Sequence, residues 1–336
     1  MAKSKDRKRT RDPKVIVITG ASSGFGRGMA LAMAPMGHRL VLAARRGEVL
    51  NDVIEECVRH RGDGPVNVVA VEADVSCREE NQAVADKAVA TFGRIDVWIN
   101  NAGVGAIGPF EQTPIEDHQK VIETNLIGTV HGCHAALTQF IRQGLGELPP
   151  ADARPSETNG KGEWEAVTGT IINIASDLGK MPAPYYASYA ASKHGVVGLG
   201  SSLRQEMHER GMANVHVCTV MPEAHDTPFF THAANYTGRE TVPLPPTHDP
   251  QKVVDAVVAL LDDPKAETNV GSVSPVTHAL HKLLPRPIER LTGHQVHKEQ
   301  YEKAPSSPPT RGAVHGPMRE GTGVSGGERA KKKREK

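Results

Sequence analysis

Short apolar runs rich in Val and Ile recur along the chain, separated by longer segments whose apolar residues have helical spacing. The runs are almost continuously apolar, as is typical of strands buried on both faces of a sheet. The pattern predicts six strands, at residues 14–19, 39–44, 67–71, 95–100, 170–175 and 215–220. It also predicts six helices, at residues 26–36, 48–60, 79–92, 115–142, 189–210 and 250–261.

This alternation of strand and helix predicts an α/β fold: a doubly wound, Rossmann-type parallel sheet with helices on both faces. All of the predicted elements fall within residues 14–265, so one dinucleotide-binding domain is expected there. In such a sheet, ligands bind in the crevice at the carboxyl ends of the strands.

Several segments interrupt or follow this pattern. Residues 1–13 form a basic N-terminus that is expected to be disordered, and residues 143–168 form a loop insertion at the sheet edge opposite the crevice. Residues 266–303 form a C-terminal extension that is amphipathic in part. Three alternatives remain open for it: packing on the domain, packing on a partner subunit, or weak contact with a membrane surface. Residues 304–336 are rich in Pro, Gly, Ser and charge, which predicts a disordered, solvated tail.

Composition narrows the class of protein. The 336 residues carry a net charge of +1, so no overall field favours nucleic acid or a membrane. The four cysteines lack metal-ligand or CxxC spacing. We therefore expect no metal site, and we expect the cysteines to be reduced thiols. No secretory signal and no transmembrane segment of about 18 apolar residues is apparent. A soluble cytoplasmic protein is expected.

A glycine-rich turn joins the first strand to the first helix. The run from Thr19 to Gly26 reads Thr-Gly-Ala-Ser-Ser-Gly-Phe-Gly and includes Ser22, Ser23 and Phe25. Gly20 permits the tight turn, Gly24 a close approach to a pyrophosphate, and Gly26 close packing of helix on strand. The helix N-terminus then offers unpaired N–H groups to the phosphates.

Tyr189 and Lys193 lie four residues apart in a predicted helix, in the run Tyr-Ala-Ala-Ser-Lys. Side chains at this spacing share one helical face. The lysine cation, with an oxidised nicotinamide, is expected to lower the tyrosine pKa from its ordinary value of ~10. Tyr189 is therefore the candidate general acid in carbonyl reduction and general base in alcohol oxidation. Ser176, earlier in the chain, is expected to hold the substrate oxygen near Tyr189.

These motifs, in this order, resemble the short-chain dehydrogenase/reductase family from about residue 14 to residue 230. The resemblance includes Asn101, Ala102 and Gly103 after the fourth strand, and Asn125 in the following helix. It implies that the first three pass beneath the adenosine ribose. It further implies that Asn125 bends its helix around a water connected to Lys193, and that the chain forms a homodimer or homotetramer through its long helices.

The same resemblance assigns further cofactor contacts. Asp74, followed by Val75, is implied to lie near the adenine amino group, and a role as N-cap of the next helix is compatible with that position. Lys193 is implied to bind the nicotinamide ribose beside Tyr189. Pro222 and Thr227 match the segment that lies against the nicotinamide carboxamide.

The end of the second strand indicates which nicotinamide cofactor is used. A carboxylate there usually binds the adenosine ribose and favours NAD. This chain has Arg45 and Arg46 instead, which can meet a 2′-phosphate with charge-assisted hydrogen bonds. NADP(H) is therefore predicted over NAD(H), the alternative being that both arginines are merely solvated.

Glu223 is the one departure from the family pattern, since it follows Pro222 where glycine is usual. Two hypotheses remain open: the carboxylate points outward and is harmless, or it weakens cofactor binding. His225, two residues later, is expected to be a solvent-facing loop residue, the alternative being a second acid–base group.

The expected substrate pocket is apolar, formed by Val104, Ala106, Ile107, Phe110, Met181, Pro182, Tyr185, Met221, Phe229 and Phe230. Tyr186 is also expected to line it. An apolar ketone, aldehyde or secondary alcohol fits such a pocket better than a sugar or an acid. The predicted function is NADP(H)-dependent interconversion of a carbonyl and an alcohol. Reduction of a C=C or C=N bond, or a regulatory protein that only binds the cofactor, remain as alternatives.

Overall fold

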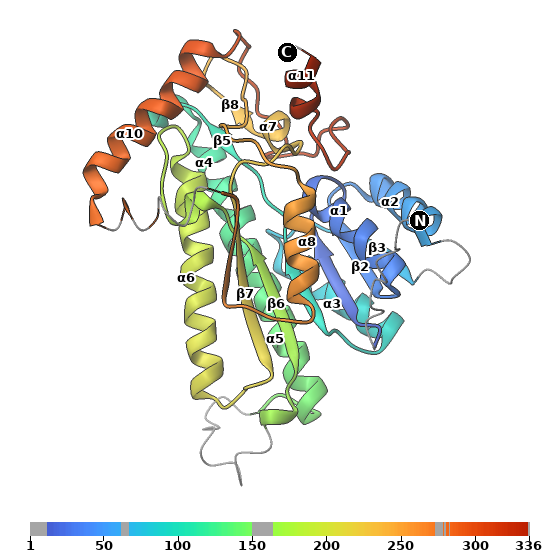
Figure 1. Ribbon diagram of the computed structural model, residues 1–336. Helices are drawn as coiled ribbons and strands as arrows, with labels where there is room; N and C mark the ends of the chain where they lie inside the picture. The colour runs from blue at the N-terminus through green and yellow to red at the C-terminus, as the bar shows by residue number, and fades with distance from the viewer. Residues whose placement is uncertain are drawn as a thin grey trace, which may run out of the picture.

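The computed structural model describes residues 12–61, 67–149, 164–272, 278, 280–281 and 283–334. Seven parallel strands form one sheet in the order β3-β2-β1-β4-β6-β7-β9 (Figure 1). They are β1 (Val15–Thr19), β2 (Arg39–Ala44), β3 (Val68–Glu72), β4 (Val97–Asn100), β6 (Gly169–Ile174), β7 (Val215–Pro222) and β9 (Glu267–Val270). All six predicted strands are present. The seventh, β9, lies at the edge of the sheet, and its short polar sequence carries no apolar run to reveal it.

Three helices cover each face of the sheet, as the alternation of strand and helix predicts. One face carries α1 (Gly24–Met33), α2 (Gly47–Arg61) and α8 (Gln251–Leu260); the other carries α3 (Arg78–Phe92), α5 (Gly128–Leu145) and α6 (Ala187–Glu209). Successive side chains of a strand point to opposite faces. In β1, accordingly, Ile16 and Ile18 pack in the first of these layers and Val17 in the second.

The predicted helix at 115–142 is divided into two by a π-helical turn. Helix α4 (Ile115–Ile122) passes through this turn, Glu123–Ile127, into α5. Such turns inside α-helices are frequent at functional sites. Asn125 lies in the turn and is completely buried.

The strand order places a crevice at the carboxyl ends of β1 and β4. The chain runs outward from β1 through β2 to β3 and then returns to the other side of β1 as β4. The connections that leave β1 and β4 therefore diverge, which opens the crevice where ligands bind in doubly wound sheets.

A small layer, formed by β5 (Ala106–Ile107) and by elements from the C-terminal half of the chain, lies at one end of the sheet (Figure 1). It contains α7 (Phe229–His232), the pair of β5 with β8 (Ala234–Asn235), and α10 (Pro285–His297). The two prolines of the predicted amphipathic segment, Pro285 and Pro287, lie in the first turn of α10, where proline is tolerated. None of the helices described is both long enough and apolar enough to cross a membrane.

The C-terminal tail differs from the expectation of disorder. Residues 304–331, here called the C-terminal strap, pack against the domain, and α11 (Glu328–Arg334) begins within their last turn of chain. Val314 is completely buried, and Gly312 and Gly321 take positive φ values that let the chain turn sharply. Composition alone predicts disorder here because it does not reveal the partners that the strap meets on the folded domain. Most of the predicted insertion at 143–168, and nearly all of the basic N-terminus, lie outside the described residues.

Candidate active site

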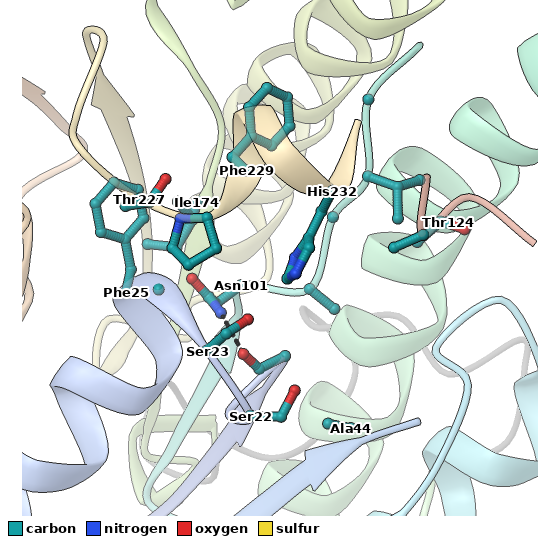
Figure 2. Close-up of a pocket in the computed structure, with 18 of the residues that line it drawn as sticks. Ser22, Ser23, Phe25, Ala44, Asn101, Thr124, Ile174, Thr227, Phe229 and His232 are labelled. Carbon is teal, nitrogen blue, oxygen red and sulfur yellow. Dashed lines mark hydrogen bonds between the residues drawn. The ribbon is translucent and has the colours of Figure 1, made fainter. Parts of the chain in front are cut away.

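A cavity of about 230 Å³ opens at the crevice (Figure 2). The structure brings into its lining every residue expected to bind the cofactor except Gly26: Gly20, Ser22, Ser23, Gly24, Phe25, Arg45, Arg46, Asp74, Val75, Asn101, Ala102, Gly103, Tyr189, Lys193, Pro222 and Thr227. Ser176 also lines it. Residues from six different connections of the sheet therefore meet around one cavity.

The glycine-rich turn forms a surface that only glycine permits. A Cβ on Gly20 would lie 2.7 Å from the Ala102 Cα, and Gly20 has a φ of +65°. A Cβ on Gly26 would lie 2.3 Å from the Gly20 carbonyl oxygen, so Gly26 acts beneath the cavity rather than in its lining. The first turn of α1 carries no acidic residue, which leaves the positive end of the helix dipole available to an anion. The turn therefore suits a pyrophosphate.

Thr19 fastens the turn to the loop after β4. Its hydroxyl accepts hydrogen bonds from the backbone N–H groups of Asn101 (3.0 Å) and Ala102 (3.1 Å). The side-chain amide of Asn101 donates to the Thr19 carbonyl at 2.9 Å. The two loops therefore hold each other in place and support one side of the cavity.

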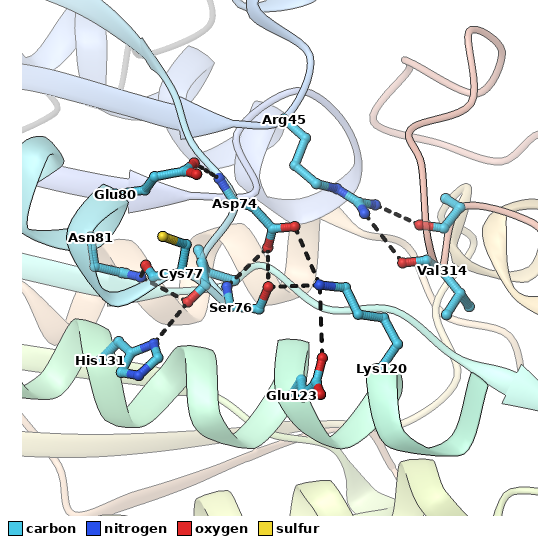
Figure 3. A network of polar contacts seen from close by, with 12 residues as sticks. Arg45, Asp74, Ser76, Cys77, Glu80, Asn81, Lys120, Glu123, His131 and Val314 are labelled. Atoms are coloured by element: carbon cyan, nitrogen blue, oxygen red, sulfur yellow. Dashed lines mark hydrogen bonds and ion pairs between the residues drawn. The ribbon is translucent and has the colours of Figure 1, made fainter. Parts of the chain in front are cut away.

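Arg45 and Arg46, here called the cationic corner, lie at the end of β2. Nη2 of Arg46 donates to the hydroxyl oxygens of Ser22 and Ser23, at 2.9 Å in each case. Arg45 donates to the main-chain carbonyls of Ala313 and Val314 in the C-terminal strap (Figure 3). All of these hydrogen-bond acceptors are uncharged, and they orient the two guanidinium groups. The charge that acts on Arg45 is that of the nearby Asp74 carboxylate.

Asp74 lies beside this corner within a network of polar contacts (Figure 3). Its carboxylate accepts hydrogen bonds from the backbone N–H and the hydroxyl of Ser76 (2.9 and 2.8 Å) and lies 3.5 Å from Nζ of Lys120. Burial acts to raise the pKa of Asp74, but the Ser76 hydrogen bonds and the charges of Lys120 and Arg45 hold that pKa below its ordinary value. Cys77, not Asp74, occupies the N-cap position of α3, so the capping role is not observed.

Tyr189, Ser176 and Lys193 meet at the inner end of the cavity. Burial raises the pKa of Tyr189 to about 12, and the hydrogen bond with Ser176 opposes that rise. Burial also lowers the pKa of Lys193 to about 8. Nζ of Lys193 lies 5.7 Å from the centre of the Tyr189 ring and donates to the Ile174 carbonyl at 2.8 Å. In the protein alone, burial thus outweighs the lowering of the tyrosine pKa that the lysine spacing predicts.

Asn125 acts on this site through the loop after β4. Its side chain accepts a hydrogen bond from the Val104 N–H (2.8 Å) and donates to the Val104 carbonyl (2.9 Å). It also donates to the Ser192 hydroxyl at 3.1 Å, next to Lys193. Asn125 is not part of the cavity lining, so in this structure its contacts are positioning contacts.

The two tyrosines before Tyr189 do not line the cavity. Tyr186 is buried in an apolar cluster with Ile107 and Val296. Tyr185 has a φ of +71°, a strained conformation for a bulky residue, and its hydroxyl is 2.6 Å from Nδ1 of His297 in α10. The strain is concentrated where α10 meets the start of α6.

Only part of the expected apolar pocket lines the cavity. Val104, Phe229 and Phe230 do so, and the Phe229 ring lies 5.2 Å from that of Tyr189. Ile107 and Met221 are core residues instead, and Phe110 is exposed and stacks on His118. Helix α7, which carries Phe229, therefore covers the phenol.

Glu223 lines the cavity, but the two residues that bind its carboxylate do not. It accepts hydrogen bonds from Nε2 of His248 (2.9 Å) and the backbone N–H of Ser272 (3.1 Å). His225 is buried, contrary to the expectation of a solvent-facing loop residue, and meets the Phe25 ring edge-on. These partners favour the hypothesis that the Glu223 charge does not disturb a bound cofactor.

Some residues around the cavity were not expected from the sequence. His232 lines it from α7, and its Nε2 lies 2.9 Å from the Glu320 carbonyl. Ala313, Pro317 and Met318 line it from the strap. A histidine in a short helix and three small or apolar residues in a Pro/Gly-rich tail carry no sequence signal of their own.

A phosphate-sized cradle and the phenol of Tyr189 beside the ammonium group of Lys193 lie together at the switch point of a doubly wound sheet. This combination defines a nucleotide-dependent oxidoreductase. The family model for short chain dehydrogenases matches residues 14–148 and 163–236. The chain belongs to this family and is an NAD(P)-dependent oxidoreductase.

Characterised and uncharacterised relatives agree with this assignment. An uncharacterized oxidoreductase, YxnA, of Bacillus subtilis is 30% identical over 90% of this chain and 78% of its own length. The 3beta-hydroxysteroid dehydrogenase 1 of Eggerthella lenta is 32% identical over 74% of this chain and 87% of its own length.

Solved structures of the family share the fold. An alcohol dehydrogenase of Thermococcus sibiricus in complex with 5-hydroxy-NADP has a TM-score of 0.61 and 27% identity, covering 78% of this chain and 98% of that one. A family member from Burkholderia phymatum in complex with NAD has a TM-score of 0.67 and 26% identity, covering 82% and 95%. These neighbours include complexes with both cofactors.

Replacing Lys193 with methionine is expected to stabilise the fold while removing activity. Burial shifts the pKa of Lys193 from 10.5 to about 8, so the folded protein holds the proton less tightly than the unfolded chain. The resulting cost is fully present below pH 8 and disappears as the pH rises from about 8 to 10.5. Allowing for the lost hydrogen bond to Ile174, Lys193→Met should raise the free energy of unfolding by about 2 kcal/mol at pH 7.

Urea denaturation of both proteins at pH 7 and at pH 10 measures this difference. The gain should be largest at pH 7 and should shrink towards pH 10. The matched control is Lys87→Met, at an exposed lysine of α3, which should change stability little at either pH. A loss of stability in Lys193→Met at pH 7 would show that the buried ammonium is fully compensated by its surroundings.

Proposed function

We propose that this protein is an NADP(H)-dependent oxidoreductase that interconverts an apolar ketone or aldehyde and the corresponding alcohol. The observation that carries this proposal is the hydroxyl of Tyr189, hydrogen-bonded with Ser176 and next to Lys193, in a cavity whose far end carries Arg45 and Arg46. The glycine-rich turn lies between these two ends and suits a pyrophosphate.

The roles of the chain's residues follow from this arrangement. The dinucleotide, when bound, supplies or accepts the hydride. Ser176 holds the substrate oxygen beside Tyr189, and Tyr189 donates its proton to that oxygen in reduction or removes it in oxidation. Lys193, with a pKa near 8, is charged at neutral pH and favours the phenolate. Phe229 and Val104 exclude water from the reacting groups.

The preference for NADP(H) over NAD(H) is supported by the cationic corner. Arg46 and the hydroxyls of Ser22 and Ser23 place three hydrogen-bonding groups side by side at the cavity wall. The guanidinium charges of Arg45 and Arg46 are met by uncharged main-chain and hydroxyl groups, which suits a 2′-phosphate.

The surroundings of Glu223 bear on the rival functions. A regulator that only binds the cofactor has no need of the Tyr189–Lys193 pair. The partners of Glu223 weigh against the one feature that favours such a regulator. Reduction of a C=C or C=N bond uses the same scaffold and is separated from carbonyl reduction by the product formed.

We further propose a cytoplasmic homo-oligomer, since members of this family are commonly oligomeric. Large apolar side chains are exposed along α4, the π-helical turn and α5, which are expected at the subunit interface: Ile115, Ile122, Ile127 and Val130. Size-exclusion chromatography with light scattering distinguishes a dimer or tetramer from a monomer.

A panel of apolar ketones and aldehydes tests the proposed function. The purified protein should oxidise NADPH in the presence of at least one aromatic or alicyclic carbonyl compound, with a higher kcat/KM for NADPH than for NADH. A higher kcat/KM for NADH would reject the cofactor assignment. Failure of the protein to bind either dinucleotide would reject the function altogether.

A further inference from the structure

The C-terminal strap meets the cavity on several sides. In chain order it contacts the end of β2, helix α4, the N-terminus of α1 and the loop after β7. The family model ends at residue 236, so the strap is an addition of this chain to the part that the model matches. What the strap does is therefore not implied by family membership.

The first anchor of the strap is on α4. Nε2 of His315 lies 2.7 Å from the carboxylate of Asp117, which is completely buried and also accepts a hydrogen bond from the Tyr236 hydroxyl at 2.6 Å. Next to it, Val314 is buried in a cluster with Val104, against which Tyr189 packs. A buried carboxylate with a histidine partner and a fully buried valine make this a firm attachment.

The second anchor is Asp226, in the loop after β7. Its carboxylate is 2% exposed and accepts hydrogen bonds from the Ser325 hydroxyl (2.9 Å) and the backbone N–H groups of Glu328 (3.0 Å) and Arg329 (3.1 Å). The side chain thus binds the first turn of α11, as a helix-capping carboxylate does. Its neighbour Thr227 lines the cavity.

Between the anchors, the strap touches the groups expected to meet the cofactor's phosphates. The carbonyls of Met318 and Glu320 accept from Nη1 of Arg46, at 3.0 and 3.3 Å. The Gly323 carbonyl accepts from the backbone N–H of Gly24, the first residue of α1, at 2.9 Å. These contacts use uncharged carbonyls, and strap residues belong to the cavity lining, so the strap forms a wall of the cavity and leaves its positive charge uncancelled.

We propose that the C-terminal strap closes over the bound dinucleotide and that detachment of the strap limits its release. The proposal rests on the proposed function, since it requires a dinucleotide in the cavity. Because the strap is attached at both Asp117 and Asp226, a cofactor extending from Arg46 to Lys193 is enclosed between it and the glycine-rich turn. Opening of such a covering segment limits turnover in many enzymes.

The test compares NADPH release from the full chain and from a variant with loosened anchors. His315→Ala combined with Ser325→Ala removes one side-chain contact at each anchor and leaves the cavity-lining residues in place. Stopped-flow displacement of NADPH, followed by its fluorescence, should show release about tenfold faster or more in the double variant, as the loss of two hydrogen bonds to carboxylates implies. Arg319→Ala, at an exposed strap residue, is the matched control and should release NADPH at the wild-type rate.

A second measurement uses the unaltered protein and does not depend on how the variant folds. Hydrogen exchange of backbone amides in residues 305–327 should be slower with NADPH bound, because a strap that closes over the cofactor is held by it. Faster exchange with NADPH, or tighter NADPH binding by the double variant, would mean that strap and cofactor compete. Equal release rates and unchanged exchange would equally overturn the proposal.

These outcomes separate the two claims. If NADPH binds but its release rate does not depend on the anchors, the proposed role of the strap is rejected and the proposed function stands. No binding of NADPH or NADH by the wild-type protein rejects both.

Discussion

Tyr189→Phe is expected to lower kcat for ketone reduction by about 10²–10⁴-fold, the usual contribution of a positioned general acid. The substitution removes one oxygen atom from a mostly buried ring that packs on Tyr186 and Phe229. Because the apolar contacts remain, the fold should be retained and the affinity for NADPH should change far less than kcat. Single-turnover oxidation of NADPH with a saturating ketone measures the loss at the chemical step.

Tyr186→Phe is the matched control for this experiment. Tyr186 is also buried, lies three residues away, and has a hydroxyl for which the described residues show no hydrogen-bond partner. Burial raises its pKa further than that of Tyr189, which makes it a poorer acid–base group at neutral pH. Its substitution should leave kcat within about threefold. If Tyr189→Phe kept more than a tenth of the wild-type rate, the proton donor would have to be another group.

Arg46→Ala is expected to weaken NADPH binding by about 10–100-fold and NADH binding by less than about threefold, since a hydrogen bond to a charged group is worth ~1.5–3 kcal/mol. The side chain holds the hydroxyls of Ser22 and Ser23 at the cavity wall. Only NADPH carries the 2′-phosphate that this group is proposed to bind, so the effect should separate the two cofactors. Titration calorimetry with each cofactor measures both affinities.

Arg46 also holds two carbonyls of the strap, and the NADH titration controls for that contact. If the substitution only loosened the strap, the affinities for NADPH and NADH would fall alike. If it removes a phosphate contact, only the affinity for NADPH falls. Arg59→Ala, at an exposed arginine of α2, removes the same charge from the surface and should change neither affinity. An equal loss for NADPH and NADH in Arg46→Ala would contradict the assignment of the cationic corner.

The fold and the core of the site could be predicted from the sequence because their signals are local. Buried parallel strands require continuous apolar runs such as Val15–Thr19, and a pyrophosphate turn requires glycine where a Cβ would collide, as at Gly20 and Gly26. The spacing of Tyr189 and Lys193 is set by one turn of helix. Each of these patterns is fixed by the backbone of a single element, so it remains visible without tertiary information.

What the sequence does not reveal depends on contacts between distant segments. The strap reads as disordered from composition, yet its stability comes from partners such as Asp117, Asp226 and Arg45, more than 90 residues away in the chain. The tyrosine pKa is another example. Helical spacing predicts a lowered value beside Lys193, whereas burial from several elements raises it in the protein alone. Burial is a property of the whole fold, and a motif does not encode it.

The most direct test of the central claim is the fate of the transferred hydrogen. The protein is incubated with a ketone from the panel and NADPH that carries deuterium at the transferable position of the nicotinamide, and the product is examined by mass spectrometry. The account predicts an alcohol with one deuterium on the former carbonyl carbon, formed by the wild-type protein and at least about 10²-fold more slowly by Tyr189→Phe. Deuterium found instead on the carbon of a reduced C=C bond, or NADPH consumption that is unaffected by Tyr189→Phe, would contradict it.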